Sequence, residues 1–372
     1  MNGRVPALVV CHEGLLLEEG GGVQVCHREY MAGLREAGFQ CRDVVFKFTN
    51  GFAQKLGRRV SPRLATMDPP ANLLAEIEQA LGESKATTVF FGFNVFPDLS
   101  CRLKQSFPEV RQVLLSHGAE SLDYCVEQRM RRRNKTENRR SAVAERLLGR
   151  ELMDEVAQRH WVDAVLTLSP FEAEIERWLG ARKSLWVPRT ILEPALDVHP
   201  IDGRVGCVST LNHPPNLDGL ESLFDALEGV VPPEFRFRLV GQPSSHGKAL
   251  AARYPFVEYL GPLPDSDLRS EASTWCCFVH PLFVYAKGCS TKLGVALGWG
   301  LPIATTRFGA RGYVWDENVV PLVDAPVELA QLAVERSRGR RFEFYQGGTK
   351  KLCAAAPTIG AVGASIRNFV LG

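Results

Sequence analysis

Short apolar runs alternate with amphipathic stretches over the first half of the chain. The runs have the length of buried strands and cover residues 7–11, 43–46, 88–91, 113–116, 164–168 and 185–187. Between the first two runs, apolar residues recur at spacings of three and four from Val23 to Ala37, which predicts a helix that ends at Gly38. Because helices connect parallel strands, the alternation predicts a parallel sheet covered by helices.

A second alternating series follows a proline-containing stretch. Residues 188–203 carry three prolines and little periodicity, so we expect a hinge linker over 189–203. The next apolar runs cover residues 205–208, 235–240, 256–260, 276–279, 301–305 and 319–322. The sequence therefore predicts an α/β fold with two doubly wound, Rossmann-like domains, over 1–188 and 204–356, and a helical segment over 357–372.

Composition agrees with two domains and narrows the class of protein. A chain of 372 residues is longer than one core usually grows, and its 45% hydrophobic and 23% charged residues are typical of a soluble globular protein. A net charge of +2 argues against nucleic acid as a partner. The ten scattered cysteines favour buried thiols in a cytoplasmic protein over metal ligands or disulfides.

One basic run departs from this balance. It extends from Arg129 to Arg140 with the sequence RMRRRNKTENRR. One interpretation is a solvated helix face or loop, and the other is a contact with an anionic acceptor or with the inner membrane face, which would make the protein peripheral to the membrane.

The richest chemistry lies in residues 276–312. An apolar run is followed by a loop, by Gly288, and by a helix that opens at Cys289, Ser290 and Thr291, with Lys292 on its first turn. The first turn of a helix presents unpaired N–H groups and the positive end of the helix dipole. Together with the lysine charge, this pattern predicts a phosphate-binding site.

The same stretch resembles the donor site of the group 1 glycosyltransferases, which are retaining enzymes with the two-lobed GT-B fold. The matching residues are Gly288, Lys292, Ala296, Gly300, Pro302 and Thr305. The resemblance implies two Rossmann-like domains facing each other across a cleft, with 357–372 crossing back to the first. Two acidic residues of the family pattern are missing, because Val295 stands where a ribose-binding glutamate is usual and Lys287 stands near the other.

The resemblance also implies the reaction. A sugar would pass from a nucleoside-diphosphate-sugar donor to a hydroxyl of a glycan, lipid-linked or small-molecule acceptor, with no metal and no further cofactor. Lys292 would stabilise the leaving diphosphate. The expected donor-binding residues are Gly21, Gly22, Thr210, Gly241, Leu260, Gly288, Cys289, Ser290, Thr291, Lys292 and Val295.

Charge near the diphosphate is the point on which this chain differs from many relatives. Where they carry arginine and lysine after the first strand of the second domain, this chain has Ser209, Thr210, Asn212 and His213. Neutral donors bind phosphate less strongly, so Lys292 must supply most of the positive charge, with Arg307 or Arg189 as further sources.

Two features of the first domain are candidates for the same site. Gly20, Gly21 and Gly22 open the first helix and would let backbone N–H groups approach a ligand, although a plain flexible turn is the alternative. His117 follows the fourth strand, and in similar enzymes a histidine here contacts the donor sugar near the reacting carbon. The alternative for His117 is an ordinary core or surface histidine.

Other classes are less well supported. Asp265 and Asp267 suggest a D-x-D metal motif, but their place after Pro264 favours a helix start. The glycine run lacks the G-x-G-x-x-G spacing of a nicotinamide dehydrogenase. A nucleotide- or glycan-binding homologue without turnover, and a GT-B epimerase or phosphorylase, remain as alternatives.

Overall fold

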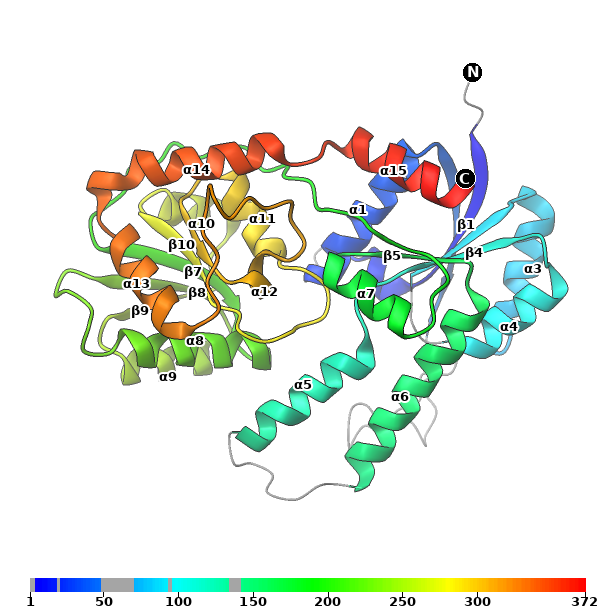
Figure 1. Ribbon diagram of the computed structural model, residues 1–372, viewed down its shortest axis with the longest axis horizontal. Helices are drawn as coiled ribbons and strands as arrows, with labels where there is room; N and C mark the ends of the chain where they lie inside the picture. Colours follow the sequence, from blue (N-terminus) through cyan, green and yellow to red (C-terminus); the bar gives the residue numbers. More distant parts are fainter. Residues whose placement is uncertain (1–3, 19–20, 48–69, 93–95, 134–141) are drawn as a thin grey trace. The chain divides into compact units, whose positions relative to one another are not determined.

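The computed structural model describes residues 4–18, 21–47, 70–92, 96–133 and 142–372 (Figure 1). The chain divides into two compact units. Unit 1 contains Met1–Pro188 together with Thr358–Gly372, and unit 2 contains Arg189–Pro357. Each unit has its own parallel sheet and its own core.

The sheet of unit 1 has six parallel strands in the order β2-β1-β3-β4-β5-β6. The strands are β1 Val5–His12, β2 Phe39–Phe46, β3 Thr88–Phe91, β4 Arg111–Leu115, β5 Ala164–Thr167 and β6 Ser184–Trp186. Each apolar run expected in this half overlaps one of these strands, so the prediction of a parallel sheet is confirmed. The middle strands β3 and β5 are buried along their whole length, as a sheet covered on both faces requires.

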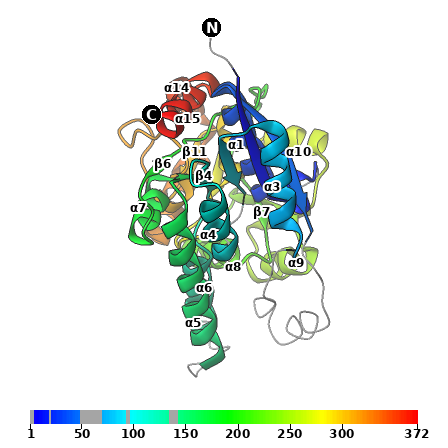
Figure 2. The same cartoon turned by 90° about the vertical axis from the view of Figure 1, so that its right-hand side faces the viewer.

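Helices flank this sheet, and two of them extend away from it. They are α1 Gly22–Glu36, α3 Leu73–Ser84, α4 Pro97–Ser106, α5 Glu120–Arg133, α6 Ala142–Trp161, α7 Pro170–Trp178 and the short 3-10 helix η1 Glu13–Leu16. The two helices α5 and α6 contact each other, and Figures 1 and 2 both show them reaching beyond the sheet. As predicted, α1 ends before Gly38, whose φ of 84° is easily adopted by glycine.

The C-terminal helix α15, Ile359–Leu371, belongs to unit 1 and packs against α1. Close approach depends on two glycines: a Cβ on Gly33 would lie 2.9 Å from Ile366 Cδ1, and one on Gly363 would lie 2.5 Å from Glu36 Cβ. Arg367 also donates a 2.8 Å hydrogen bond to the carbonyl of Ala37. Residues at the two ends of the sequence therefore share one hydrophobic interface.

The sheet of unit 2 has five parallel strands in the order β11-β10-β7-β8-β9. They are β7 Arg204–Thr210, β8 Arg236–Gln242, β9 Val257–Gly261, β10 Cys277–His280 and β11 Ile303–Thr305. The helices of the unit are α8 Pro214–Leu227, α9 Ser244–Arg253, α10 Asp265–Ala272, α11 Thr291–Gly298, α12 Arg307–Ala310, α13 Pro326–Arg336 and α14 Phe342–Ala355, with the 3-10 helix η3 Gly339–Arg341.

The expected sixth strand at residues 319–322 is not formed, and that prediction is wrong. The amides of Val319 and Val320 both bond to the carbonyl of Asp316 in a turn, and only Val323 makes an isolated bridge, to Thr306. Val320 is buried in the core of unit 2. Its apolar character therefore reflects packing from a turn and not a strand.

The segment expected as a hinge, 189–203, has no helix or regular strand and follows unit 2. Its backbone is hydrogen-bonded there at several points: Arg189 to Gly312, Leu196 to Trp299, His199 to Ser273, Ile201 to Thr274 and Gly203 to Ser337. The chain thus enters unit 2 immediately after Pro188.

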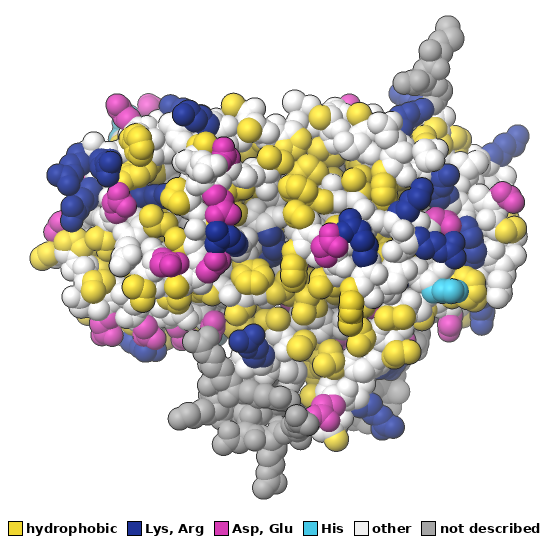
Figure 3. Space-filling model, in the orientation of Figure 1, with side chains coloured by type: hydrophobic (Ala, Val, Ile, Leu, Met, Phe, Trp, Pro, Cys, Tyr) yellow, Lys and Arg dark blue, Asp and Glu magenta, His cyan; other side chains and the backbone are white. Residues whose placement is uncertain are grey.

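Charged side chains of both signs are interspersed on the face drawn in Figure 3, with apolar side chains among them. This mixture agrees with the small net charge of +2. No described helix is long and apolar enough to span a bilayer.

Candidate functional site

The strand order of unit 2 creates a switch point beside β7. The chain adds β8 and β9 on one side of β7, then returns to add β10 and β11 on the other. Helices leave neighbouring strands in opposite directions at such a point, and ligands of doubly wound sheets bind there, at the carboxyl ends of the strands. Thr210 ends β7 and His280 ends β10, so these residues mark the candidate site.

Ser290 connects the end of β10 to the start of α11. Its hydroxyl oxygen accepts the Leu293 N–H at 3.3 Å, which makes it the N-cap of the helix, and lies 2.7 Å from His280 Nε2. His280 is buried, and burial together with the charge of Lys292 lowers its pKa to about 3. The neutral imidazole therefore fixes the Ser290 hydroxyl without placing a charge at the end of the helix.

Lys292 and Thr210 meet across the switch point. Lys292 Nζ donates to Thr210 Oγ1 at 3.3 Å, although 82 positions separate the two residues in sequence. Burial lowers the pKa of Lys292, and Asn216 holds the end of β7 by donating its side-chain amide to the carbonyl of Thr210 at 3.1 Å. The structure thus brings two predicted donor-binding residues together, with the lysine charge beside the first turn of α11.

Two side chains hold the loop that precedes α11. Gly288 has a φ of 74°, a conformation that favours glycine. The Arg311 guanidinium donates to the carbonyls of Ala286 and Gly288, and the Tyr313 hydroxyl donates to the carbonyl of Ser290. Because these carbonyls already have donors, the loop is fixed independently of any ligand.

Arg189 lies at the same place. It is 5% exposed, its Nη1 is 3.3 Å from Cys289 Sγ, and its guanidinium carbon lies 5.7 Å from the centre of the Tyr313 ring. Arg307, the other expected source of charge, is exposed and paired with Asp324 and Glu317. Its charge is therefore largely balanced where it stands. Arg189 adds a buried charge beside Cys289, which lies in the loop before the N-cap of α11 and not in the helix as expected.

The remaining predicted donor residues of unit 2 surround this centre unequally. Thr291 is the first residue of α11. Gly241 lies opposite Ser209 in the β7–β8 pairing, and a Cβ there would collide with the Ser209 carbonyl at 1.8 Å. Leu260 lies in β9, at the edge of the sheet, and packs against the core. Gly241 therefore borders the site, while Leu260 lies two strands away from β7.

Val295 is half-buried on α11 and packs against the hydrophobic core, so no carboxylate stands at this helical position. A nearby acid such as Glu271 or Asp316 is a candidate to take its place, but the Glu271 carboxylate is already engaged. Its two carboxylate oxygens accept from Arg238 at 2.7 and 2.8 Å, and one also accepts from Trp275 Nε1 at 2.8 Å.

In unit 1, a comparable switch point lies between β1 and β3, and the glycine candidates follow β1 there. Gly21 is the N-cap of α1 and Gly22 is its first residue. His117 is half-buried after β4, with its ring 5.6 Å from that of Tyr30 and 6.3 Å from that of His27. The structure thus groups His117 with side chains of α1.

His27 is an unexpected member of this group. It is 1% exposed, and neither ring nitrogen has a hydrogen-bond partner among the described residues. Burial, with a smaller effect of the Arg28 charge, lowers its pKa to about 4.

The acidic pair after Pro264 and the basic run are the two remaining features of the sequence. Asp265 and Asp267 lie in the first turn of α10, as expected for a helix start. Within the described part of the chain, no three His, Cys, Asp or Glu residues are placed to share a metal ion. Of the basic run, residues 134–141 lie outside the described residues.

Sequence reasoning missed His280, Arg311 and Tyr313. His280 could have been found from the sequence, because it ends an apolar strand directly before Pro281. His117 was singled out for a similar position, after the end of β4. Arg311 and Tyr313 carried no such signal, since the loop carbonyls that they hold lie more than 20 positions away.

Comparison with known proteins identifies this arrangement. Residues 202–335 match the family described as Glycosyl transferases group 1. Similar solved structures include Anabaena HepE in complex with UDP, at 15% identity, covering 98% of this chain and 99% of that chain with a TM-score of 0.65. Sucrose-phosphate synthase from Thermosynechococcus elongatus is 17% identical, with 98% of both chains covered and a TM-score of 0.70. The lipopolysaccharide outer core galactosyltransferase WaaB is 12% identical, covering 98% of this chain and 99% of that chain with a TM-score of 0.62.

No curated protein matches the chain in a sequence search. Most of unit 2 is thus similar to the group 1 glycosyltransferases, and the chain has the GT-B fold with two Rossmann-like domains. The predicted fold and the predicted glycosyltransferase class are both confirmed.

Proposed function

We propose that the protein is a retaining, metal-independent glycosyltransferase that moves a sugar from a nucleoside diphosphate to an acceptor hydroxyl. The observation that carries the proposal is the contact between Lys292 and Thr210 across the β7–β10 switch point, beside the capped start of α11. An ammonium group and the positive end of a helix dipole at one place suit a diphosphate.

The leaving diphosphate gains negative charge as the bond to the sugar breaks. Groups that are already oriented toward that charge lower the barrier, because they need not reorganise during the reaction. Ser290 is held by His280, and the preceding loop by Arg311, so the start of α11 is oriented in this way. The Lys292 charge and the dipole of α11 would supply the stabilisation that a metal ion provides in other enzymes.

The acceptor and the sugar require groups from unit 1. We assign sugar contact to His117 and backbone contact to Gly21 and Gly22, on the resemblance to the family. The two glycines start α1 at the β1–β3 switch point, and the His117 ring lies beside side chains of the same helix. Uridine nucleotides are the first donors to test, because HepE is described in complexes with UDP and with UDP-glucose.

The decisive experiment compares UDP with uridine on Lys292→Ala. Loss of one charge-assisted contact should cost about 1.5–3 kcal/mol, or roughly 10- to 150-fold in the Kd for UDP, and leave uridine binding unchanged. Lys350→Ala, which removes an exposed lysine from α14, is the matched control. Equal affinity of Lys292→Ala and the parent for UDP, GDP, dTDP and ADP would remove Lys292 from the diphosphate site.

A binding protein without turnover is the second candidate, favoured by the absence of a carboxylate at Val295 and the engagement of Glu271 by Arg238. Hydrolysis of a nucleotide-sugar donor separates the two candidates. Nucleotide binding with neither hydrolysis nor transfer would favour the binding protein.

A further inference from the structure

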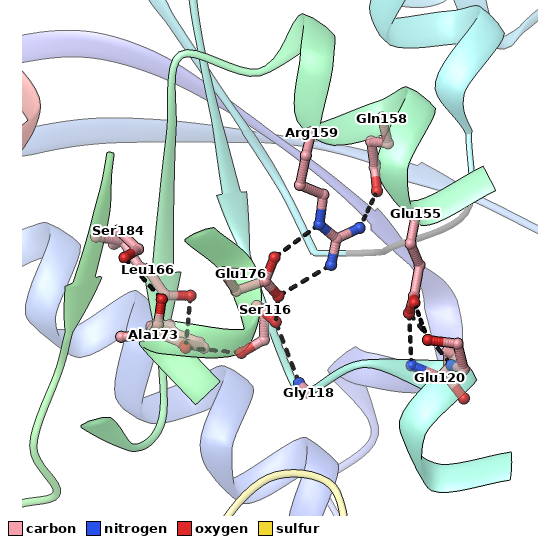
Figure 4. Close-up of polar contacts among 12 residues, drawn as sticks. Ser116, Gly118, Glu120, Glu155, Gln158, Arg159, Leu166, Ala173, Glu176 and Ser184 are labelled. Carbon is pink, nitrogen blue, oxygen red and sulfur yellow. Dashed lines mark hydrogen bonds and ion pairs between the residues drawn. The ribbon is translucent and has the colours of Figure 1, made fainter. Parts of the chain in front are cut away.

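A chain of buried polar groups lies beneath the turn that carries His117 (Figure 4). Arg159 at the end of α6 and Glu176 in α7 are 0% and 1% exposed and form a two-point ion pair. Arg159 Nε donates to Glu176 Oε2 at 2.7 Å and Arg159 Nη2 donates to Oε1 at 2.9 Å. Gln158 Oε1 accepts a further bond from Arg159 Nη1 at 3.0 Å.

This ion pair is connected to the residues on both sides of His117. The Ser116 hydroxyl donates to Glu176 Oε1 at 2.6 Å and accepts the Gly118 N–H at 3.2 Å. Gly118 has a φ of 105°, which side chains disfavour. The Ser116 hydroxyl thus belongs to the residue before His117 and bonds the residue after it. Through this hydroxyl, Glu176 holds the turn that carries the histidine.

A second contact reaches the same turn from α1. The Tyr30 hydroxyl donates to the carbonyl of Ser116 at 2.8 Å, and the Tyr30 ring meets the His117 ring edge-on at 5.6 Å. The backbone before His117 and the ring itself are thus both restrained from the α1 side.

Stability alone is a weak reason for such an arrangement. A buried ion pair often contributes no more than hydrophobic residues of similar volume, because desolvation of both charges offsets their attraction. A carboxylate held by a guanidinium does, however, provide a strong acceptor in a fixed place. The strength and direction of the Ser116 contact point to a role in placing the turn.

We propose that Glu176, held by Arg159, and Tyr30 are positioning residues that fix the His117 imidazole through Ser116. The functional part of this inference rests on the proposed function, in which His117 contacts the donor sugar. Residues of α1, α6 and α7 would then determine the orientation of one side chain at the carboxyl end of β4.

Ser116→Ala tests the proposal directly, because it removes the hydroxyl and leaves the Arg159–Glu176 pair intact. Ser184→Ala is the control, since that hydroxyl donates to the carbonyl of Ala173 at 2.9 Å and has no bond to the His117 turn among the described residues. In full-length protein labelled with ¹⁵N-histidine, the His117 resonances, assigned with His117→Ala, should shift or broaden in Ser116→Ala and stay unchanged in Ser184→Ala. Ser116→Thr, which restores a hydroxyl, should return them toward their original positions.

The kinetic arm uses donor hydrolysis or transfer, normalised to the stoichiometry of UDP binding. Misplacing a contacting group should lower kcat roughly 10- to 100-fold in Ser116→Ala, with little change in the donor KM. Unchanged His117 resonances in folded Ser116→Ala overturn the positioning role, whatever the activity. Should Ser116→Ala not fold, Tyr30→Phe takes its place, and unchanged His117 resonances there overturn the proposal.

The two proposals fail separately. If the parent shows neither hydrolysis nor transfer, the proposed function fails, and the resonances still decide the positioning role. If His117→Ala lowers kcat and folded Ser116→Ala does not, the function stands and the positioning role is overturned.

Discussion

Gly294 and Tyr313 offer a sensitive test of the packing around the start of α11. A Cβ on Gly294 would lie 2.5 Å from the Tyr313 hydroxyl oxygen and 3.3 Å from two carbons of the ring. That hydroxyl donates to the carbonyl of Ser290, so it cannot move without losing the bond. We therefore expect Gly294→Ala to crowd the hydroxyl more than the ring.

The expected free energies follow from three contributions. Crowding in a packed region costs about 1–3 kcal/mol, while replacing glycine by alanine inside a helix contributes about 0.5–1 kcal/mol of stability. Gly294→Ala should then lower the free energy of unfolding by about 0.5–2 kcal/mol. Tyr313→Phe alone should cost about 0.5–1.5 kcal/mol through the lost hydrogen bond.

In the double variant, the destabilisation caused by Gly294→Ala should disappear. In the Tyr313→Phe background the 2.5 Å contact is gone, so Gly294→Ala should be neutral or stabilising by up to about 1 kcal/mol. Urea denaturation of the four proteins gives the coupling energy. Gly149→Ala, in an exposed part of α6 with open space around the added methyl, calibrates the helix contribution. Destabilisation of equal size in both backgrounds would refute the reasoning.

Three further outcomes are expected. Because the pKa values of His27 and His280 in the folded protein lie at about 4 and about 3, below 6.5, the unfolded chain binds more protons as pH falls below 6.5. Stability should therefore fall from pH 7 to pH 5 by up to about 2 kcal/mol per histidine, and His27→Gln should reduce the drop; an equal drop in that variant would contradict this. With Val295 in place of a carboxylate, 2′-deoxyuridine diphosphate should bind within about tenfold of UDP, roughly 1.4 kcal/mol, whereas a hundredfold ribose preference in competition binding would reveal another ribose ligand. Transfer should survive EDTA, and loss of activity that Mg²⁺ or Mn²⁺ restores would show that the metal-independent proposal is wrong.

Local patterns were sufficient for the elements that lie close together in sequence. Short apolar runs located β1 and β3, apolar spacings of three and four located α1, and the glycine at position 38 marked the end of that helix. The first turn of α11, with Ser290 as N-cap and Lys292 beyond it, was legible because a helix start is a property of neighbouring residues. The turn at 319–322 was misassigned, because a buried apolar run has the same composition in a turn and in a strand.

The sequence by itself determined two sheets of parallel strands with connecting helices and a helix start suited to phosphate. Only the tertiary structure decided which residues meet there. Lys292 reaches Thr210 because β10 returns to the opposite side of β7 from β8, and strand order is a choice between global packings that no local spacing records. The Arg159–Glu176–Ser116 connection has the same origin, since burial of a charge depends on a partner that folding brings from another element.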